Sequence, residues 1–187
     1  VFGYTSGATD LVVDVNGAIA LGSGFTPVNP ARLYESRTDP DSKTVDGQFL
    51  AGGRLAADQI VSFQVAGRAG IAPGAAAASL NVVAVFADGP GFLTVYPCDQ
   101  PRPIPAASVN YGGGDVRPNA VLSKLSATGT VCVYTSSPTD LVVDVNGAIA
   151  LGSGFTPVNP ARLLETRSGP GLTTVDGQSQ GVGRASD

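Results

Sequence analysis

A long internal repeat constrains this chain more than any other feature of its sequence. Residues 1–57 match residues 131–187 at a constant offset of 130, and 39 of these 57 positions are identical. The identity is unbroken from Thr9 to Leu33, which correspond to Thr139 and Leu163. A period of 130 residues is too long for a solenoid repeat and has the size of a whole globular domain. The sequence therefore predicts tandem domains, each with its own core.

A short Gly-Ser-Gly segment within each copy of the repeat marks the expected domain boundaries. It occurs at residues 22–24 and 152–154, directly after an apolar stretch, and its composition is typical of a linker. We therefore expect one complete unit over residues 25–151. Residues 1–21 would be the terminal strands of a preceding unit, and residues 155–187 would be the start of the next. Because each linker has only three residues, we expect an extended, semi-rigid array.

The hydrophobic pattern within the unit is that of short strands. Hydrophobic residues make up 43% of the chain, and 25 glycines with 14 prolines supply turns. Apolar and polar side chains alternate over residues 59–65, while the run 80–87 is apolar on both faces, as in a central strand. Further strands are expected at 92–97, 120–125, 131–135 and 141–145.

These strands predict an all-β fold, an antiparallel β-sandwich of jelly-roll or immunoglobulin-like type, repeated in tandem. The spacing of the strands does not decide between the two topologies. The turn composition of residues 88–91 further predicts that the strands at 80–87 and 92–97 pair as a hairpin.

Charge and residue content exclude several classes of function. Only 14% of residues are charged and the net charge is −4, which disfavours nucleic acid and anionic membrane surfaces as partners. No apolar run reaches the length of a membrane span. The chain has no histidine, so a Ser-His-Asp or Cys-His relay is excluded, and a Ser-Lys dyad would need Lys43 or Lys124. We therefore expect no enzymatic activity and no cofactor.

The two cysteines, Cys98 and Cys132, each flank a predicted strand. We expect a structural disulfide between them, rather than free or catalytic thiols. Such a bond would close a loop of roughly 35 residues and would stabilise the unit by about 3–4 kcal/mol if chain entropy dominates.

Several charged residues persist in both copies although neighbouring turn residues change. These are Arg32, Glu35, Arg37, Asp46 and Arg54, which correspond to Arg162, Glu165, Arg167, Asp176 and Arg184. We predict a partly buried ion-pair network of Arg32, Glu35, Arg37 and Arg54, in which Glu35 pairs with Arg37 or Arg54. Loss of one partner of such a buried pair costs about 3–5 kcal/mol. The alternative is an arginine-rich site for an anion or a uronate.

Three acidic residues have a spacing that is similar to that of a calcium loop, namely Asp39, Asp41 and Asp46. The second copy has Gly169 and Gly171 at the first two positions. Since a metal essential to the fold would need its ligands in both units, a polar turn is the favoured interpretation.

Tyrosines and asparagines offer a second candidate for ligand binding. Tyr96, Tyr111 and Tyr134, with Asn110 and Asn119, could form a sugar-binding face, because aromatic rings stack on pyranose rings. Packed tyrosines with bonded hydroxyls at the rim of a sheet explain the same residues.

A series of short motifs resembles a repeat domain of large secreted proteins of actinobacteria and related bacteria. The motifs are those of residues 30–37, 44–48, 53–54, 65–68, 80–82, 91–98 and 143–147, in that order, and the resemblance covers residues 25–151. It implies a secreted, surface-associated, non-catalytic β domain that often occurs in tandem or beside cell-wall-active catalytic domains. One departure is visible, because Ala148, Ile149 and Ala150 stand where the family often has an aromatic pair.

The expected function is that of a structural repeat in an extracellular bacterial surface protein or filament, as a spacer, stalk or fibre-forming unit with possible adhesive properties. Its expected partners are neighbouring copies of the same repeat, in head-to-tail or lateral contact. The alternative is a carbohydrate- or cell-wall-binding module whose partners are surface glycans, since repetition of a weak site gives avidity.

Overall fold

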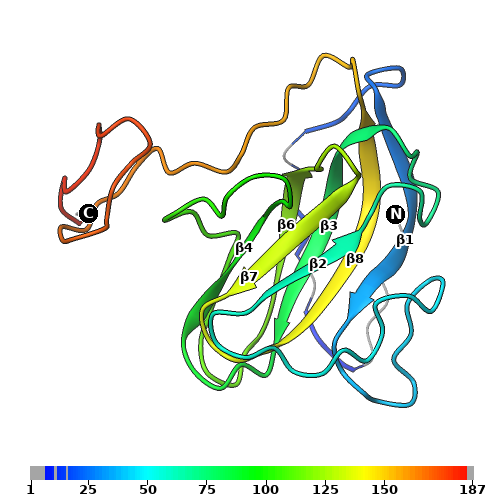
Figure 1. Cartoon of the computed structure of the whole chain (residues 1–187), viewed down its shortest axis with the longest axis horizontal. Helices are drawn as coiled ribbons and strands as arrows, with labels where there is room; N and C mark the ends of the chain where they lie inside the picture. The colour runs from blue at the N-terminus through cyan, green and yellow to red at the C-terminus, as the bar shows by residue number, and fades with distance from the viewer. Residues whose placement is uncertain (1–6, 11, 16, 185–187) are drawn as a thin grey trace.

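The computed structural model describes residues 7–10, 12–15 and 17–184, and its regular structure consists of eight strands (Figure 1). The strands are β1 (Phe25–Glu35), β2 (Ile60–Gln64), β3 (Ala75–Val85), β4 (Gly91–Pro97), β5 (Val109–Tyr111), β6 (Val116–Lys124), β7 (Thr130–Thr135) and β8 (Asp140–Ala150). All eight lie within the unit predicted at residues 25–151. The described residues contain no helix, and so none that could cross a membrane.

The strands form two four-stranded antiparallel sheets, with the orders β1-β8-β3-β6 and β2-β7-β4-β5. The all-β prediction of a sandwich is therefore confirmed. Within the sheets β1 pairs with β8, β2 with β7, β3 with β6 and β4 with β5. This nested pairing describes one long hairpin rolled into two layers, which is the jelly-roll rather than the immunoglobulin-like arrangement.

The core lies between the two sheets and is built from the inward-facing residues of both. Its largest fully buried apolar side chains are Phe63, Leu33, Leu55, Leu80, Leu93, Leu141, Val65, Val82, Val95, Val131 and Val133. The strand β3 lies between β8 and β6, so the sequence run that is apolar on both faces does occupy a central position. Burial of this apolar surface is the main force that holds the two layers together.

The prediction of a hairpin between residues 80–87 and 92–97 is wrong. The corresponding strands β3 and β4 lie in different sheets, and both edges of each are taken by other strands. Phe86 has a left-handed backbone (φ 49°), and Asp88 donates its N–H to Pro138 O (2.9 Å). The turn therefore carries the chain from one layer to the other, and β3 pairs along both of its edges with the distant strands β8 and β6.

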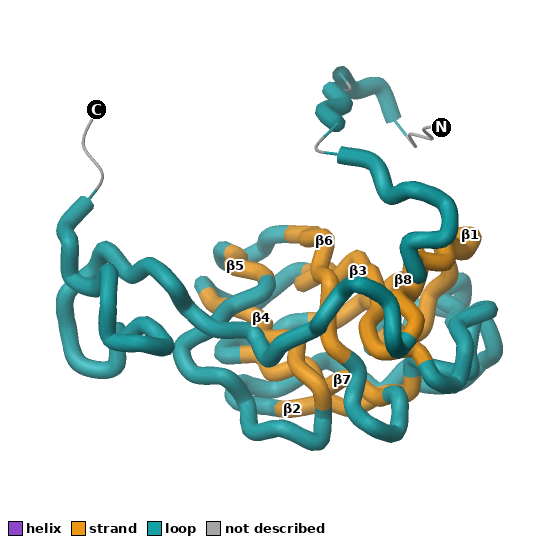
Figure 2. The backbone as a smooth tube through the Cα atoms, turned by 90° about the horizontal axis from the view of Figure 1, so that it is seen from above, coloured by secondary structure: helices purple, strands orange, loops and turns teal. Residues whose placement is uncertain are grey.

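The flanking segments lie outside the two sheets (Figure 2). Residues 7–10, 12–15 and 17–21 carry no strand, although strands of a preceding unit were predicted there, and residues 1–6, 11 and 16 lie outside the described part. Residues 155–184 contain one isolated bridge, between Glu165 and Gln180. They touch the sandwich at the loop after β4, where Arg162 Nη2 donates to Pro105 O (2.6 Å). A sequence copy of each terminal strand thus flanks the sandwich.

Candidate functional site

The junction between β1 and β8 is the candidate functional site, because both Gly-Ser-Gly segments of the repeat, residues 22–24 and 152–154, lie there. Phe25 lies opposite Ile149, and the N–H of Ala150 donates to Gly24 O (2.9 Å). The chain therefore enters and leaves the sandwich at the same end. Gly24 has φ +88°, and a Cβ at this position would collide with the side chain of Ser153. The two linkers lie side by side, and only glycine permits this approach.

Glu35 is the buried centre of the ion pairs at the opposite end of β1. It is fully buried and accepts hydrogen bonds from Arg37 Nε (2.9 Å), Arg37 Nη2 (2.8 Å), the Arg37 backbone N–H (3.0 Å) and Arg32 Nη1 (2.8 Å). Burial by itself raises the pKa of Glu35. The hydrogen bonds from Arg37 and the charges of both arginines outweigh burial, so this pKa lies below its ordinary value.

Arg32 extends this cluster to the neighbouring strand. Its Nε donates to Asp144 Oδ1 in β8 at 2.9 Å, while its Nη1 holds Glu35. One guanidinium thus connects the end of the edge strand β1 to the middle of β8. Because the pairs share Arg32, we expect their contributions to stability to be non-additive.

Arg54 does not contact Glu35, so this part of the predicted network is wrong. Its guanidinium instead bonds Asp140 Oδ2 (2.7 Å) and Asp88 Oδ1 (2.6 Å). Asp140 also accepts a hydrogen bond from Ser36 Oγ (2.7 Å), so it connects the start of β8 to the residue that follows β1. The sequence could not predict this arrangement, because strand order decides which carboxylate lies beside Arg54.

A second ion pair joins the loop after β1 to the other sheet. Arg68 is almost completely buried and bonds both carboxylate oxygens of Asp46, at 2.6 and 2.7 Å. The same guanidinium donates to Leu33 O and Gln64 O, each at 2.9 Å. The hydrogen bonds from Arg68 are the main cause that lowers the pKa of Asp46 to about 2. Arg68 was not among the predicted site residues, although the retention of Asp46 as Asp176 indicated a partner for the carboxylate.

The calcium interpretation of Asp39, Asp41 and Asp46 is not supported by this geometry. Asp46 is committed to Arg68, and the side chain of Asp39 is two-thirds exposed. Among the described residues no group of three or more acidic, cysteine or histidine residues could hold a metal ion. The segment behaves as a polar turn.

The predicted arginine-rich anion site is already neutralised by carboxylates of the chain. A shallow depression of about 320 Å³ lies against Arg37, Arg54 and Asp140. Arg37 is paired with Glu35, and Arg54 with Asp140 and Asp88. An incoming anion would therefore have to compete with partners that are already in place.

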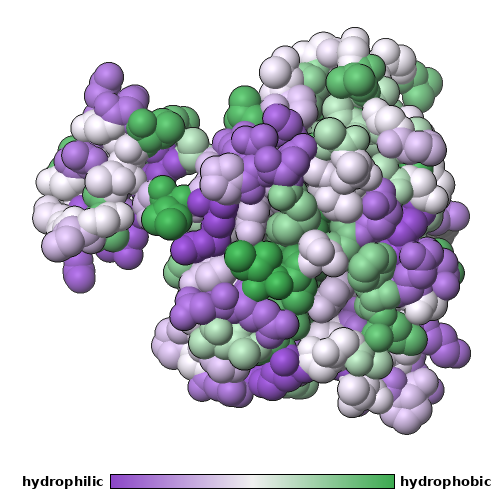
Figure 3. All heavy atoms as spheres, viewed as in Figure 1, coloured by the Kyte–Doolittle hydropathy of each residue, from purple (hydrophilic) through white to green (hydrophobic). Residues whose placement is uncertain are grey.

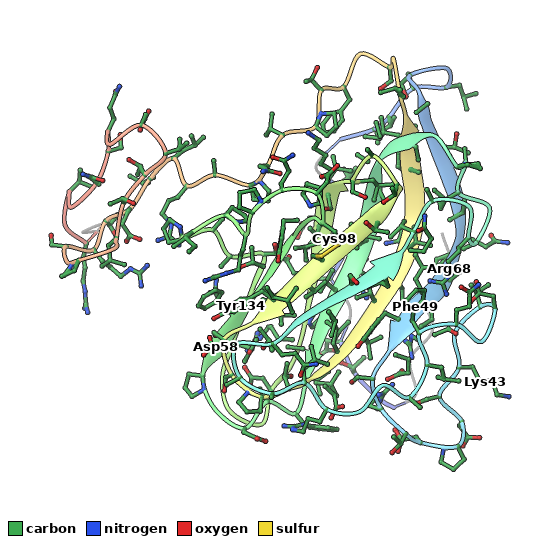
Figure 4. The ribbon with its side chains drawn as sticks, viewed as in Figure 1. Lys43, Phe49, Asp58, Arg68, Cys98 and Tyr134 are labelled. Atoms are coloured by element: carbon green, nitrogen blue, oxygen red, sulfur yellow. A yellow bond between two sulfur atoms is a disulfide. The ribbon has the colours of Figure 1, made fainter. Side chains whose placement is uncertain are left out.

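The structure contains the disulfide between Cys98 and Cys132 (Figure 4). It joins the residue after β4 to the middle of β7 and lies in a small cluster on the outer face of the second sheet. This cluster consists of Tyr96, Cys132 and Tyr134, with Phe92 and Cys98 packed against it. The bond is thus placed to hold the segment after β4 against β7.

The three tyrosines considered for sugar binding do not offer open ring faces. All are at least 93% buried: Tyr96, Tyr111 and Tyr134. The Tyr111 hydroxyl is 2.7 Å from Thr135 Oγ1, and the guanidinium of Arg102 covers the Tyr134 ring at 3.9 Å. The Tyr134 hydroxyl donates to Asp58, which is the main cause that raises the pKa of Tyr134. Packing and hydrogen bonding account for these side chains.

The two asparagines considered for sugar binding, Asn110 and Asn119, have different surroundings. Asn119 uses its amide to donate to Ser108 O (2.6 Å), while Asn110 lies exposed on the edge strand β5. They do not complete a shared polar surface with the tyrosines.

Comparisons of the chain with protein-family models, curated proteins and solved structures give no match. Fold and site together define a β-sandwich whose two flanking Gly-Ser-Gly segments lie at one end.

Proposed function

We propose that the chain is part of an extracellular structural array in which the sandwich at residues 25–151 is the repeating unit. The observation that carries this proposal is the second copy of β1 and its following loop, at residues 155–184, which extends the repeat beyond a complete sandwich. A disulfide is favoured in oxidising compartments, which supports an extracellular location. Neighbouring copies of the unit are the proposed partners.

The position of the linkers limits the kind of structural role. The antiparallel strands β1 and β8 meet the linkers at the same end, where Phe25 lies opposite Ile149. Tension between the linkers would break the hydrogen bonds of this pair one after another from that end. A spacer or display element fits this geometry better than a cable that bears load, and successive units would branch from a common linker region rather than continue in a straight rod.

Single-molecule force spectroscopy on the whole chain tests this role. Pulling through the two termini applies unzipping tension to β1 and β8, whereas pulling through Lys43 and Leu151 loads the same strands in shear. Both of these residues are exposed, so handles attached there leave the fold intact. We expect a lower unfolding force through the termini. An equal or higher force through the termini would contradict the spacer role.

A glycan array with the whole chain tests the alternative of a carbohydrate- or cell-wall-binding module. The buried tyrosines and neutralised arginines predict no reproducible binding at micromolar concentration. Binding of that strength would replace the structural proposal with the binding module.

A further inference from the structure

The segment 155–184 already contains a copy of the folded loop that follows β1, although it lies outside the two sheets and touches the sandwich at the loop after β4, through Arg162 and Pro105. Three backbone hydrogen bonds recur in both copies with the same lengths. In the docked copy they run from Val45 N to Arg32 O (2.9 Å), from Glu35 N to Phe49 O (3.0 Å) and from Ala51 N to Glu35 O (2.8 Å). In the duplicate they run from Val175 N to Arg162 O (2.9 Å), from Glu165 N to Ser179 O (3.0 Å) and from Gly181 N to Glu165 O (2.8 Å). Glu165 is also held by Arg167 at 2.8 Å, as Glu35 is held by Arg37. The duplicate is therefore shaped like the docked segment.

The duplicate is also exposed and apolar where the docked segment is buried. Leu163 is 72% exposed, whereas its counterpart Leu33 is fully buried in the core. Figure 3 shows hydrophobic side chains on this outlying part of the molecule. The two segments thus differ in what covers them, and not in the residues of their first nine positions.

The duplicate can reach the edge of β8 on its own sheet. If Phe155 took the place of Phe25 opposite Ile149, five residues (150–154) would separate the paired strands. Hairpin loops of four or five residues are common. The linker residues Gly24 and Ser153 are already in contact, so both segments start from the same place. One edge of the sheet is therefore within reach of two near-identical segments.

The docked segment has contacts that its duplicate lacks. The rings of Tyr34 and Phe49 pack against Phe63 of β2, with centroids 5.2 and 6.3 Å apart. The guanidinium of Arg68 lies over the Phe49 ring at 5.0 Å (Figure 4 labels both). Such aromatic and cation–π contacts add to the burial of the rings themselves.

We propose that Tyr34 and Phe49 are the residues that select which copy of the segment occupies the edge of β8. The duplicate has Leu164 and Ser179 at these positions, so it cannot reproduce the contacts with Phe63. Near-identical neighbouring domains tend to exchange elements during folding. The aromatic pair prevents residues 155–163 from replacing residues 25–33 at the edge of β8. This inference concerns the fidelity of folding and does not rest on the proposed function.

Hydrogen exchange with mass spectrometry on the full chain tests the selection. The variant Leu164→Tyr/Ser179→Phe gives the duplicate both rings, and the two substituted side chains are exposed, so the sandwich has no reason to unfold. We expect amide exchange in the peptide 155–166 to slow by about twofold, and exchange in the peptide 25–36 to accelerate, because the two segments then compete for one edge and each occupies it about half of the time. The two peptides keep different masses in the variant, because residue 36 is serine and residue 166 is threonine.

The matched control is Val175→Phe, which adds an aromatic ring to the duplicate where the docked counterpart, Val45, stays exposed. This control should leave both peptides unchanged. Unchanged exchange in Leu164→Tyr/Ser179→Phe would overturn the selection by the aromatic pair. The variant should also remain monomeric by light scattering, because the turn delivers the duplicate to its own sheet, and a dimer would overturn that route.

Discussion

Residues 25–33 and 155–163 have the same nine amino acids but different structures. The first set forms most of β1, while the second contains no strand. Since the residues are identical, local propensity cannot be the cause. The difference comes from β8 and from the core that receives Leu33, which shows that strand formation here depends on packing against neighbours.

The loops that follow these segments behave in the opposite way. Residues 162–183 keep the backbone hydrogen bonds of residues 32–53 without contact to β8, and both retain the cluster of one glutamate with two arginines. The loop is therefore encoded locally by its own turns and ion pairs. The same comparison supplies matched controls, because each buried residue of the docked segment has a counterpart in the duplicate.

The largest expected effect is that of Glu35→Ala. Removing the buried carboxylate leaves Arg32 and Arg37 without their partner, and we expect a loss of about 3–5 kcal/mol in the free energy of unfolding. Thermal denaturation should show a fall in Tm of about 10 °C or more. Glu165→Ala, which breaks the same cluster outside the sandwich, should leave the Tm unchanged. A Tm of Glu35→Ala within a degree of wild type would refute the structural role of the cluster.

A core substitution tests the difference between residues 25–33 and the identical residues 155–163. Leu33→Ala leaves a cavity between the sheets and should cost about 3 kcal/mol. Leu163→Ala removes an exposed side chain and should have no measurable cost. Urea denaturation of both variants measures the difference. Equal midpoints for the two variants would mean that residues 155–163 also contribute to a core.

The smallest expected effect is the contribution of Asp46 and its dependence on pH. Its pKa is about 2 in the folded chain against an ordinary value of 3.8, so ionised Asp46 stabilises the fold above about pH 4. This contribution is lost as the pH falls from about 4 to about 2. Asp46→Asn should therefore be less stable than wild type at pH 6, and the difference should shrink towards pH 2.

The control for this pH dependence is Asp176→Asn. Asp176 lies in the duplicate, away from Arg68, and its substitution should leave the unfolding of the sandwich unchanged at every pH. A difference between wild type and Asp46→Asn that stayed constant from pH 6 to pH 2 would show that the ion pair with Arg68 is not its source.

The sequence predicted the local elements better than the connections between them. Alternation of apolar and polar residues predicted strands close to β2, β4 and β7, because this pattern lies within a few consecutive residues. The disulfide could be predicted because the chain has only two cysteines. The pairing of β3 with β6 and β8 rather than β4 could not be predicted, since many strand orders bury the same apolar faces.

The same limit applies to the candidate site. The retained pair Glu35 and Arg37 is close in sequence and was predicted, whereas the partners of Arg54 and Asp46 come from other strands or loops. Repetition of a charged residue indicates that it has a partner. Only the topology determines which residue that partner is.

Chemical denaturation of residues 22–154, compared with the whole chain, tests most directly whether the sandwich is a self-contained unit. All eight strands, the disulfide and the ion pairs of Glu35, Arg54 and Arg68 lie within these residues. We expect the same midpoint and the same m-value for both chains, because the flanking segments add little buried surface to the cooperative unit. A lower midpoint or a smaller m-value for residues 22–154 would contradict it.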